Sequence, residues 1–318
     1  MAKATVPPTP LTPLGMDDFT EPTLVRRWAR FWHLIRNAAW ELWRNRLATM
    51  GAVMVLILFL VACLAPFLAR YDPVKQNYRE MLQGPSAAHY FGTDKFGRDI
   101  WSRVVWGAQR SVIISMLAVT VGMLCGLPLG TISGFYGGKL DAVLMRVVDA
   151  WLAFPGLLFY LIAATIIQAY KLSLFWNTVG LIIALGVAQT PAMARLVRGS
   201  VLAEREKDYV EASRVVGERS LYIAFRQILP NCLSPVIIQG TISLGVEMLV
   251  LAALSFLGLG APPPTPDWGA DLNLAREHME TLPYLAIFPG LAISFAVLGF
   301  NLFGDGLRDM LDPRLADN

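Results

Sequence analysis

Charge is scarce in this sequence of 318 residues: only 16% of them are Asp, Glu, Lys or Arg, whereas 55% are apolar. Soluble domains carry about a quarter charged residues, so a surface this poor in charge is not that of an ordinary soluble domain. The 27 basic and 24 acidic residues leave a net charge of only +3, which excludes a strong electrostatic attraction to nucleic acid. The composition therefore indicates a membrane protein with no nucleic-acid partner.

Residues suited to metal or redox chemistry are also few. The sequence has three cysteines and three histidines, and their spacing forms neither a zinc motif nor a disulfide framework. We interpret Cys63, Cys125 and Cys232 as packing residues, since each lies in or beside an apolar stretch. The phosphate-binding pattern G-x-x-x-x-G-K-[ST] is also missing, because residues 137–140 lack its leading glycine and its hydroxyl. We therefore expect no catalytic site, metal or cofactor in this chain.

Long uncharged runs, in contrast, are plentiful. A hydrocarbon core of about 30 Å requires about 20 helical residues, and six apolar runs are long enough, at 47–69, 111–138, 150–170, 172–194, 233–260 and 281–304. Only the fifth contains a charge, Glu247. The runs predict an all-α, polytopic membrane protein with six transmembrane helices and both termini on the same side.

The distribution of basic residues predicts which side that is. Eighteen of the 27 lie on the side of the two termini, and an excess of Lys and Arg marks the cytoplasmic side of a membrane protein. We therefore expect both the N-terminus and the C-terminus in the cytoplasm.

Four glycines recur every four residues within the second run. Gly122, Gly126, Gly130 and Gly134 would share one face of a helix, and small residues at this spacing allow another helix to approach closely. The spacing predicts a helix–helix packing interface.

The loop between the fourth and fifth runs combines dense paired charge with apolar residues. From Asp208 the pattern predicts a short helix, and the residues that share one of its faces are Tyr209, Ala212, Ser213 and Val216. Gly217 can adopt the left-handed conformation that ends a helix, Ser220 can cap a second helix, and Pro230 ends or bends that helix. Glu204, before the first helix, is expected to be exposed. Taken alone, the loop is either a docking element or an amphipathic surface loop.

These residues also carry a resemblance to a known family. Residues 211–213, Gly217 and residues 229–230 resemble the EAA motif of the permease subunits of bacterial ATP-binding-cassette importers, with Ser213 in place of the motif's second alanine. Three further segments resemble the smaller permease of the dipeptide, oligopeptide and nickel importers. They precede the second run, precede the sixth run and end the chain, at 91–103, 255–269 and 304–314.

The resemblance implies a permease subunit rather than an enzyme. A second homologous permease would complete the translocation path, two ATPase subunits would bind ATP and dock on the cytoplasmic face, and a periplasmic or lipid-anchored binding protein would deliver the substrate. The chain would lie in the bacterial inner membrane, in contact with lipid. The residues that would couple it to the ATPase are Tyr209, Glu211, Ala212, Ser213, Gly217, Leu229 and Pro230.

The sequence leaves the substrate open. We favour a di- or oligopeptide over nickel or another small solute of the same importer family. A passive channel or membrane anchor is a more remote alternative, because neither requires a cytoplasmic docking element. An intramembrane enzyme would need convergent catalytic groups, and the runs offer only Glu247 and, at an edge, Asp149.

Glu247 lies four residues before the position at which the family resemblance would place a glutamate. Similar family members often carry a glutamate four residues before the run at 255–260, where this chain has Leu251. A carboxylate in the middle of a bilayer costs roughly 2.5 to 3.5 kcal/mol on insertion scales, so Glu247 should be sheltered from lipid. Two roles stay open: a group lining the translocation path that contacts a peptide's amino end, or a hydrogen-bonded carboxyl group that holds helices together.

The predicted organisation follows from these segments. Residues 1–25 form a disordered, proline-rich cytoplasmic leader. Residues 26–46 combine a stripe of tryptophans with six arginines and predict an amphipathic interfacial helix, or alternatively a juxtamembrane extension of the first span. The rest divides into a first span, a periplasmic segment, a core of five helices with a coupling loop over 195–230, and a tail, at 47–69, 70–110, 111–314 and 315–318.

Overall fold

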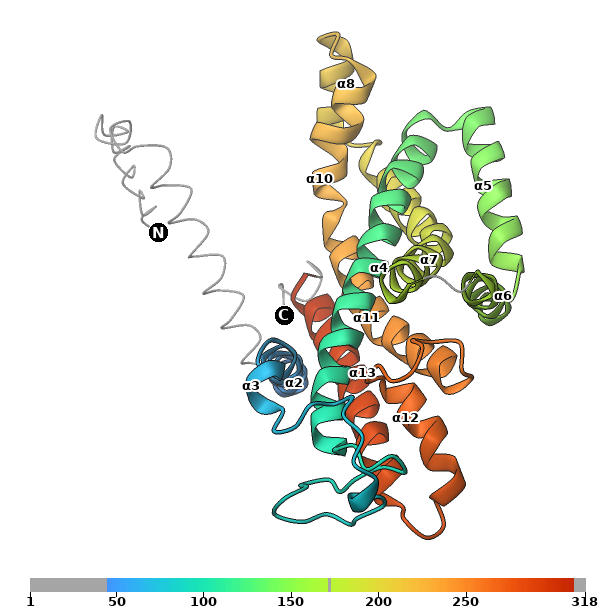
Figure 1. The fold of residues 1–318 in the computed structure, drawn as a ribbon. Coiled ribbons are helices and arrows are strands. Elements are labelled where there is room, and N and C mark those ends of the chain that lie inside the picture. Colours follow the sequence, from blue (N-terminus) through green and yellow to red (C-terminus); the bar gives the residue numbers. More distant parts are fainter. Residues whose placement is uncertain (1–44, 171–172, 312–318) are drawn as a thin grey trace, which may run out of the picture.

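The computed structural model describes residues 45–170 and 173–311, which fold into a bundle of long helices (Figure 1). The leader predicted over 1–25, nearly all of the interfacial helix predicted over 26–46, and the tail predicted over 315–318 lie outside the described residues.

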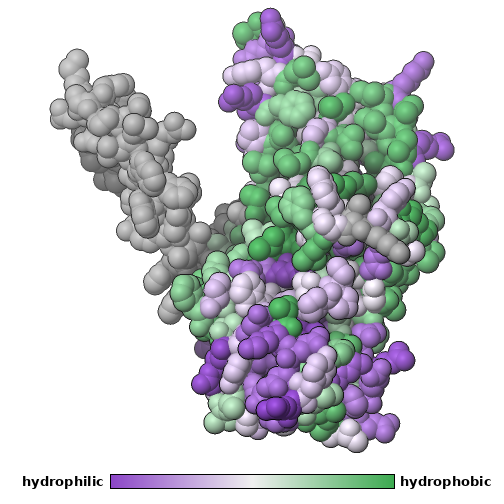
Figure 2. Space-filling view, in the orientation of Figure 1, coloured by the Kyte–Doolittle hydropathy of each residue, from purple (hydrophilic) through white to green (hydrophobic). Residues whose placement is uncertain are grey.

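Five helices are long and apolar enough to cross a bilayer: α2 (Arg46–Cys63), α4 (Ile100–Tyr136), α7 (Leu174–Glu204), α11 (Leu233–Phe256) and α13 (Tyr284–Leu311). In the part of the chain that the structure describes, pairing of extended backbone is limited to one isolated bridge, between Thr93 and Asp99. Figure 2 shows apolar side chains across the middle of the molecule and hydrophilic ones towards its two ends. The predicted all-α membrane fold is confirmed.

The third predicted span is not one straight helix. α5 (Gly138–Ala153) and α6 (Gly156–Ala169) meet at an angle of 82°, and only the pair taken together makes a sixth candidate span. The break lies at Phe154 and Pro155, where a proline disfavours the helical conformation of the residue before it. Phe154 is accordingly extended, with φ −79° and ψ 131°. The single helix expected over 150–170 is therefore wrong; we call the bent pair the elbow.

Two helices extend well beyond the uncharged runs that predicted them. α4 begins at Ile100 rather than near residue 111, and α7 continues to Glu204 rather than ending near residue 194. Charged residues inside these extensions are paired: Arg103 with Asp271 at 2.6 Å, and Arg198 with Asp141 at 2.5 Å. Absence of charge therefore marks the apolar middle of each helix but not its ends.

α4 and α7 form the closest helix pair, as the four glycines predicted. Gly122 lies against Gly186 and Gln189, Gly126 against Met193, Gly130 against Ala194 and Gly134 against Val201. A Cβ atom at Gly130 would lie 2.5 Å from the carbonyl oxygen of Ala194, so no larger residue fits without moving a backbone. The predicted packing interface is confirmed.

Short helices mark the two ends of the bundle. At one end lie α8 (Asp208–Val215), α9 (Ser220–Tyr222), the π-helical η3 (Ile223–Ile228) and α10 (Leu229–Asn231). At the other end α12 (Trp268–Ala275) and η4 (Arg276–His278) pack near the loop that contains η2 (Tyr78–Glu80), while α3 (Ala65–Leu68) follows α2 (Figure 1). The fold thus places the predicted coupling element and the region around α12 at opposite ends of the bundle.

Candidate coupling site

The first helix of the coupling loop forms where the sequence predicts it. α8 begins at Asp208 and carries acidic side chains in its first turn and Arg214 in its last, which complements the helix dipole. The chain then turns at Gly217, whose φ of +84° favours glycine. The amides of Gly217 and Glu218 donate to the carbonyls of Arg214 and Ser213, at 3.0 and 3.1 Å. The predicted glycine turn is confirmed.

The second helix differs in one detail from the prediction. Ser220 is the first residue of α9 rather than its cap; Arg219 occupies the cap position and forms no side-chain capping bond. The helix widens to π geometry in η3, where the amide of Leu229 donates to the carbonyl of Ala224. Pro230 follows directly and has no amide hydrogen to continue the ladder. A new helix, α11, starts at Leu233, so Pro230 marks the expected bend.

An apolar anchor fixes this loop to the ends of α4 and α7. Val210 is fully buried in a cluster with Phe135 of α4, Val201 of α7, and Ile223 and Ile228 of η3. A single apolar side chain on α8 therefore seats the helix on both long helices. The Arg214 guanidinium adds to this contact, 5.7 Å from the centre of the Phe135 ring.

A polar anchor lies beside the apolar one. The Tyr209 hydroxyl donates to Glu204 Oε1 at 2.9 Å and accepts a hydrogen bond from Asn231 Nδ2 at 3.1 Å. Lys207 Nζ lies 2.7 Å from Glu204 Oε2. Tyr209 thus joins the end of α7 to α8 and α10. Glu204 is buried as the acceptor of these bonds, and the expectation that it is exposed is wrong.

These contacts also set the ionisation of the polar anchor. Partial burial raises the pKa of the Tyr209 phenol; the hydrogen bond from Asn231 opposes this shift, and the bond to Glu204 adds to it. The hydrogen bond to Glu204 raises the pKa of Lys207. Tyr209 therefore stays neutral, and Lys207 charged, at neutral pH.

The outer surface of the element is free in this chain. Glu211 and Ala212 are exposed, Ser213 is half-buried, and four apolar side chains around the turn are strongly exposed: Val215, Val216, Leu221 and Tyr222. Leu229 packs against the apolar cluster, and Pro230 is exposed. The structure therefore places all seven predicted coupling residues in one element with an anchored base and an apolar tip.

The sequence did not identify Val210, Glu204 and Asn231 as the anchors, although an apolar residue among charged neighbours marks Val210.

Glu247 lies apart from the coupling element, in the middle of α11. Its side chain is 2% exposed, so it is sheltered from lipid as expected. The structure does not bring it near any of the seven coupling residues in the loop.

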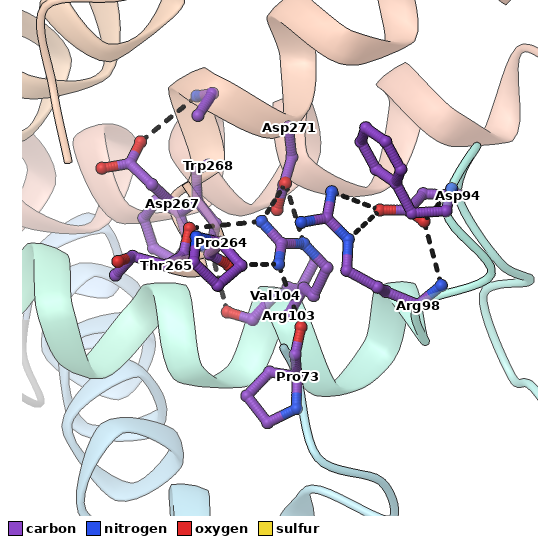
Figure 3. Close-up of polar contacts among 12 residues, drawn as sticks. Pro73, Asp94, Arg98, Arg103, Val104, Pro264, Thr265, Asp267, Trp268 and Asp271 are labelled. Carbon is purple, nitrogen blue, oxygen red and sulfur yellow. Dashed lines mark hydrogen bonds and ion pairs between the residues drawn. The ribbon is translucent and has the colours of Figure 1, made fainter. Parts of the chain in front are cut away.

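A polar clamp holds the opposite end of the bundle together (Figure 3). Arg103 donates to Asp271 from Nε and Nη2, at 2.9 and 2.6 Å, and from Nη1 to the carbonyls of Pro73 and Pro264, at 3.0 and 3.1 Å. Trp268 Nε1 donates to the carbonyl of Val104 at 2.9 Å. Burial raises the pKa of Asp271, whereas Arg103 opposes that rise. The clamp links α4 to α12 and to the two loops that contain Pro73 and Pro264.

Two of the segments that carry the family resemblance, 91–103 and 255–269, have structural roles in and around this clamp. Asp94 accepts hydrogen bonds from the amides of Phe96 and Arg98 and from Arg98 Nε, and Asp99 caps α4. Gly97 has a φ of +69°, and a Cβ there would collide with Asn77. In the second segment Asp267 caps α12 and accepts from Ser255 at 2.9 Å. Residues 91–103 and 255–269 thus meet in one structure.

Long apolar helices, together with an anchored loop whose tip exposes apolar side chains, fit a membrane transport protein of the permease class. Residues 126–317 match the family described as binding-protein-dependent transport system inner membrane component, and residues 27–85 match the N-terminal TM domain of oligopeptide transport permease C. The chain belongs to this binding-protein-dependent transport family, and the resemblance to the smaller permease of its peptide branch is confirmed.

Individual relatives align over almost the whole chain. The dipeptide transport system permease protein DppC of Alkalihalophilus pseudofirmus is 40% identical over 99% of this chain and 98% of its own length. The glutathione transport system permease protein GsiD of Pectobacterium atrosepticum is 39% identical over 91% of each. A solved structure of the MetNI methionine ABC transporter in an inward-facing conformation shares the fold, with a TM-score of 0.53 and 19% identity over 66% of this chain and 97% of that one.

Proposed function

We propose that this chain is one permease subunit of an ATP-driven, binding-protein-dependent importer of di- or oligopeptides in the bacterial inner membrane. The observation that carries this proposal is the 40% identity to a dipeptide permease over nearly the full length of both chains. The glutathione permease adds support, because glutathione is itself a small peptide.

In this proposal α8 is the element that couples transport to ATP hydrolysis. The exposed tip would enter a groove on an ATPase subunit, and the coupling residues would be Tyr209, Glu211, Ala212, Ser213, Gly217, Leu229 and Pro230. Two features support this role. The tip exposes large apolar side chains, which mark interaction sites, and its base is fixed to α4 and α7 by Val210 and Tyr209.

The remaining partners occupy other faces of the chain. A second permease would complete the translocation path, the ATP would be bound by two partner ATPase subunits, and a binding protein would deliver peptide to the outer clamp. Both termini would be cytoplasmic, on the side of α8. The charge distribution and the apolar middle of the bundle support this orientation.

Uptake by the complete transporter tests the function. The chain would be reconstituted into proteoliposomes with the second permease, the ATPase subunits and the binding protein. Labelled dipeptide should accumulate when ATP is present, and unlabelled dipeptide should compete. Accumulation of nickel without accumulation of any peptide would refute the proposed substrate.

A further inference from the structure

A buried acid with one unbonded carboxyl oxygen lies in the middle of α11. Glu247 is 2% exposed, and its Oε2 atom has no hydrogen-bond partner among the described residues. No described ion pair involves it, and α11 contains no Lys or Arg. An ionised carboxyl group in such a place is costly, so Glu247 is either protonated or paired with a cation.

A cavity lies next to this acid. The phenol of Tyr160 on α6 interacts with the Glu247 carboxyl group, and the same side chain lines a cavity of about 120 Å³. The other walls are Trp151 and Phe154 of the elbow, Phe159 of α6 and Ala188 of α7. Tyr160 therefore connects the cavity with Glu247, and the cavity wall is largely aromatic.

Two further buried polar side chains have atoms without a hydrogen-bond partner among the described residues. Both side-chain amide atoms of Gln189, next to Ala188 on α7, are unbonded, and so is the hydroxyl of Ser115 on α4. α4 and α11 run in opposite directions, with Gly240 packed against Val119 and Met123. Because seven residues make about two helical turns, Ser115 lies at about the level of Glu247. Among the described residues, α4, α7 and α11 thus each contribute a buried polar side chain with an unbonded atom.

We infer that Glu247 and this cavity form a subsite for the cationic amino terminus of a peptide, with Tyr160 positioning the carboxyl group. The inference rests on the proposed function and names the part of the peptide that the site would bind. A single carboxylate suits an ammonium group, and aromatic walls also favour a cation. The described residues contain no group of three His, Cys, Asp or Glu side chains that could hold a metal ion, which argues against nickel at this position.

The test compares a dipeptide with its des-amino analogue, which lacks the ammonium group. Uptake of both is measured in proteoliposomes carrying the complete wild-type transporter, the Glu247→Gln transporter or the Glu247→Asp transporter, after co-purification of the ATPase has shown assembly. The binding protein is the same throughout, so its own preference cancels when the ratios are compared. The preference for the free-amino peptide should fall about tenfold in Glu247→Gln, the loss expected for one charged contact. It should be largely retained in Glu247→Asp.

Two further variants complete the test. Ser243→Ala, one turn earlier on α11 and also buried, is the matched control and should keep the wild-type ratio. Tyr160→Phe removes only the hydroxyl and should lower the ratio about threefold; it serves as the second test if Glu247→Gln does not assemble. An unchanged ratio in an assembled Glu247→Gln or Tyr160→Phe transporter would overturn the inference. If the wild-type transporter takes up neither compound, the proposed function itself fails.

Discussion

The anchoring of α8 by Val210 leads to a prediction with a calculable size. Val210→Ala removes two methyl groups from a fully buried position between α4, α7 and η3. Each buried methylene-sized group contributes about 0.8 kcal/mol, and the cavity left behind adds to the loss. The closed position of α8 should therefore weaken by about 2 kcal/mol, which increases the open population of the loop about thirtyfold.

Amide hydrogen exchange of the purified chain measures this change directly. Residues 208–218 should exchange about thirtyfold faster in Val210→Ala, while the amides of α11 and α13 should be unaffected. Val216→Ala is the matched control, because Val216 is 81% exposed. It should leave exchange unchanged but weaken docking of the ATPase. Equal exchange in Val210→Ala and the wild type would refute the assignment of Val210 as the anchor.

Three other predictions concern the tip, the clamp and the topology. Ala212→Trp and Gly217→Val should insert normally but lose uptake and ATPase stimulation together, the first by blocking a groove and the second because a β-branched residue resists positive φ; full uptake in Ala212→Trp would contradict docking. Arg103→Ala should destabilise the purified chain by about 3 to 5 kcal/mol, since it leaves Asp271 buried without its partner. Because burial raises the pKa of Asp271, the folded variant binds more protons than the unfolded chain, so this loss should shrink as the pH falls. If thermal unfolding shows a loss of stability that does not depend on pH, the buried Asp271 is not the cause of that loss. A phosphatase fused after Ala261 should be active, and one fused after Leu202 inactive; the reverse pattern would invert the proposed orientation.

Local signals in the sequence were sufficient for the features that depend on one segment. A glycine that must adopt positive φ can be recognised between two short amphipathic stretches, which is why Gly217 was placed correctly. Glycines at four-residue spacing identify a close helix contact before the partner helix is known. The apolar runs identified the membrane helices because the length of a bilayer span is fixed by physics.

Features that depend on distant partners could not be read in this way. The charge of Arg110 ended the predicted second span, yet α4 continues back through the buried Arg103, whose partner Asp271 is 168 residues away in the chain. Glu204 is a charged residue in a charged segment, which predicts an exposed side chain. It is instead buried, because its carboxylate accepts hydrogen bonds from Tyr209 and Lys207. The bend at Pro155 could not be derived from the apolar run over 150–170, because membrane helices tolerate proline, and only the backbone reveals the change of direction.

The contacts of α4 and α7 explain how one small element could act on the middle of the membrane in the proposed transporter. Along Gly122–Gly134 the side chains of Gln189, Met193 and Val201 on α7 pack directly on the glycines of α4, so the helices cannot separate without losing this packing. Val210 holds α8 against the ends of both helices, and α7 carries Ala188 in the cavity wall. The elbow is tied near its start by Asp141 to Arg198 of α7 and near its end by Gln168 to the carbonyl of Gly258. In the proposed transporter, a displacement at the base of α8 would therefore be passed to α4 and α7, and through α7 to the cavity wall that Ala188 shares with the elbow.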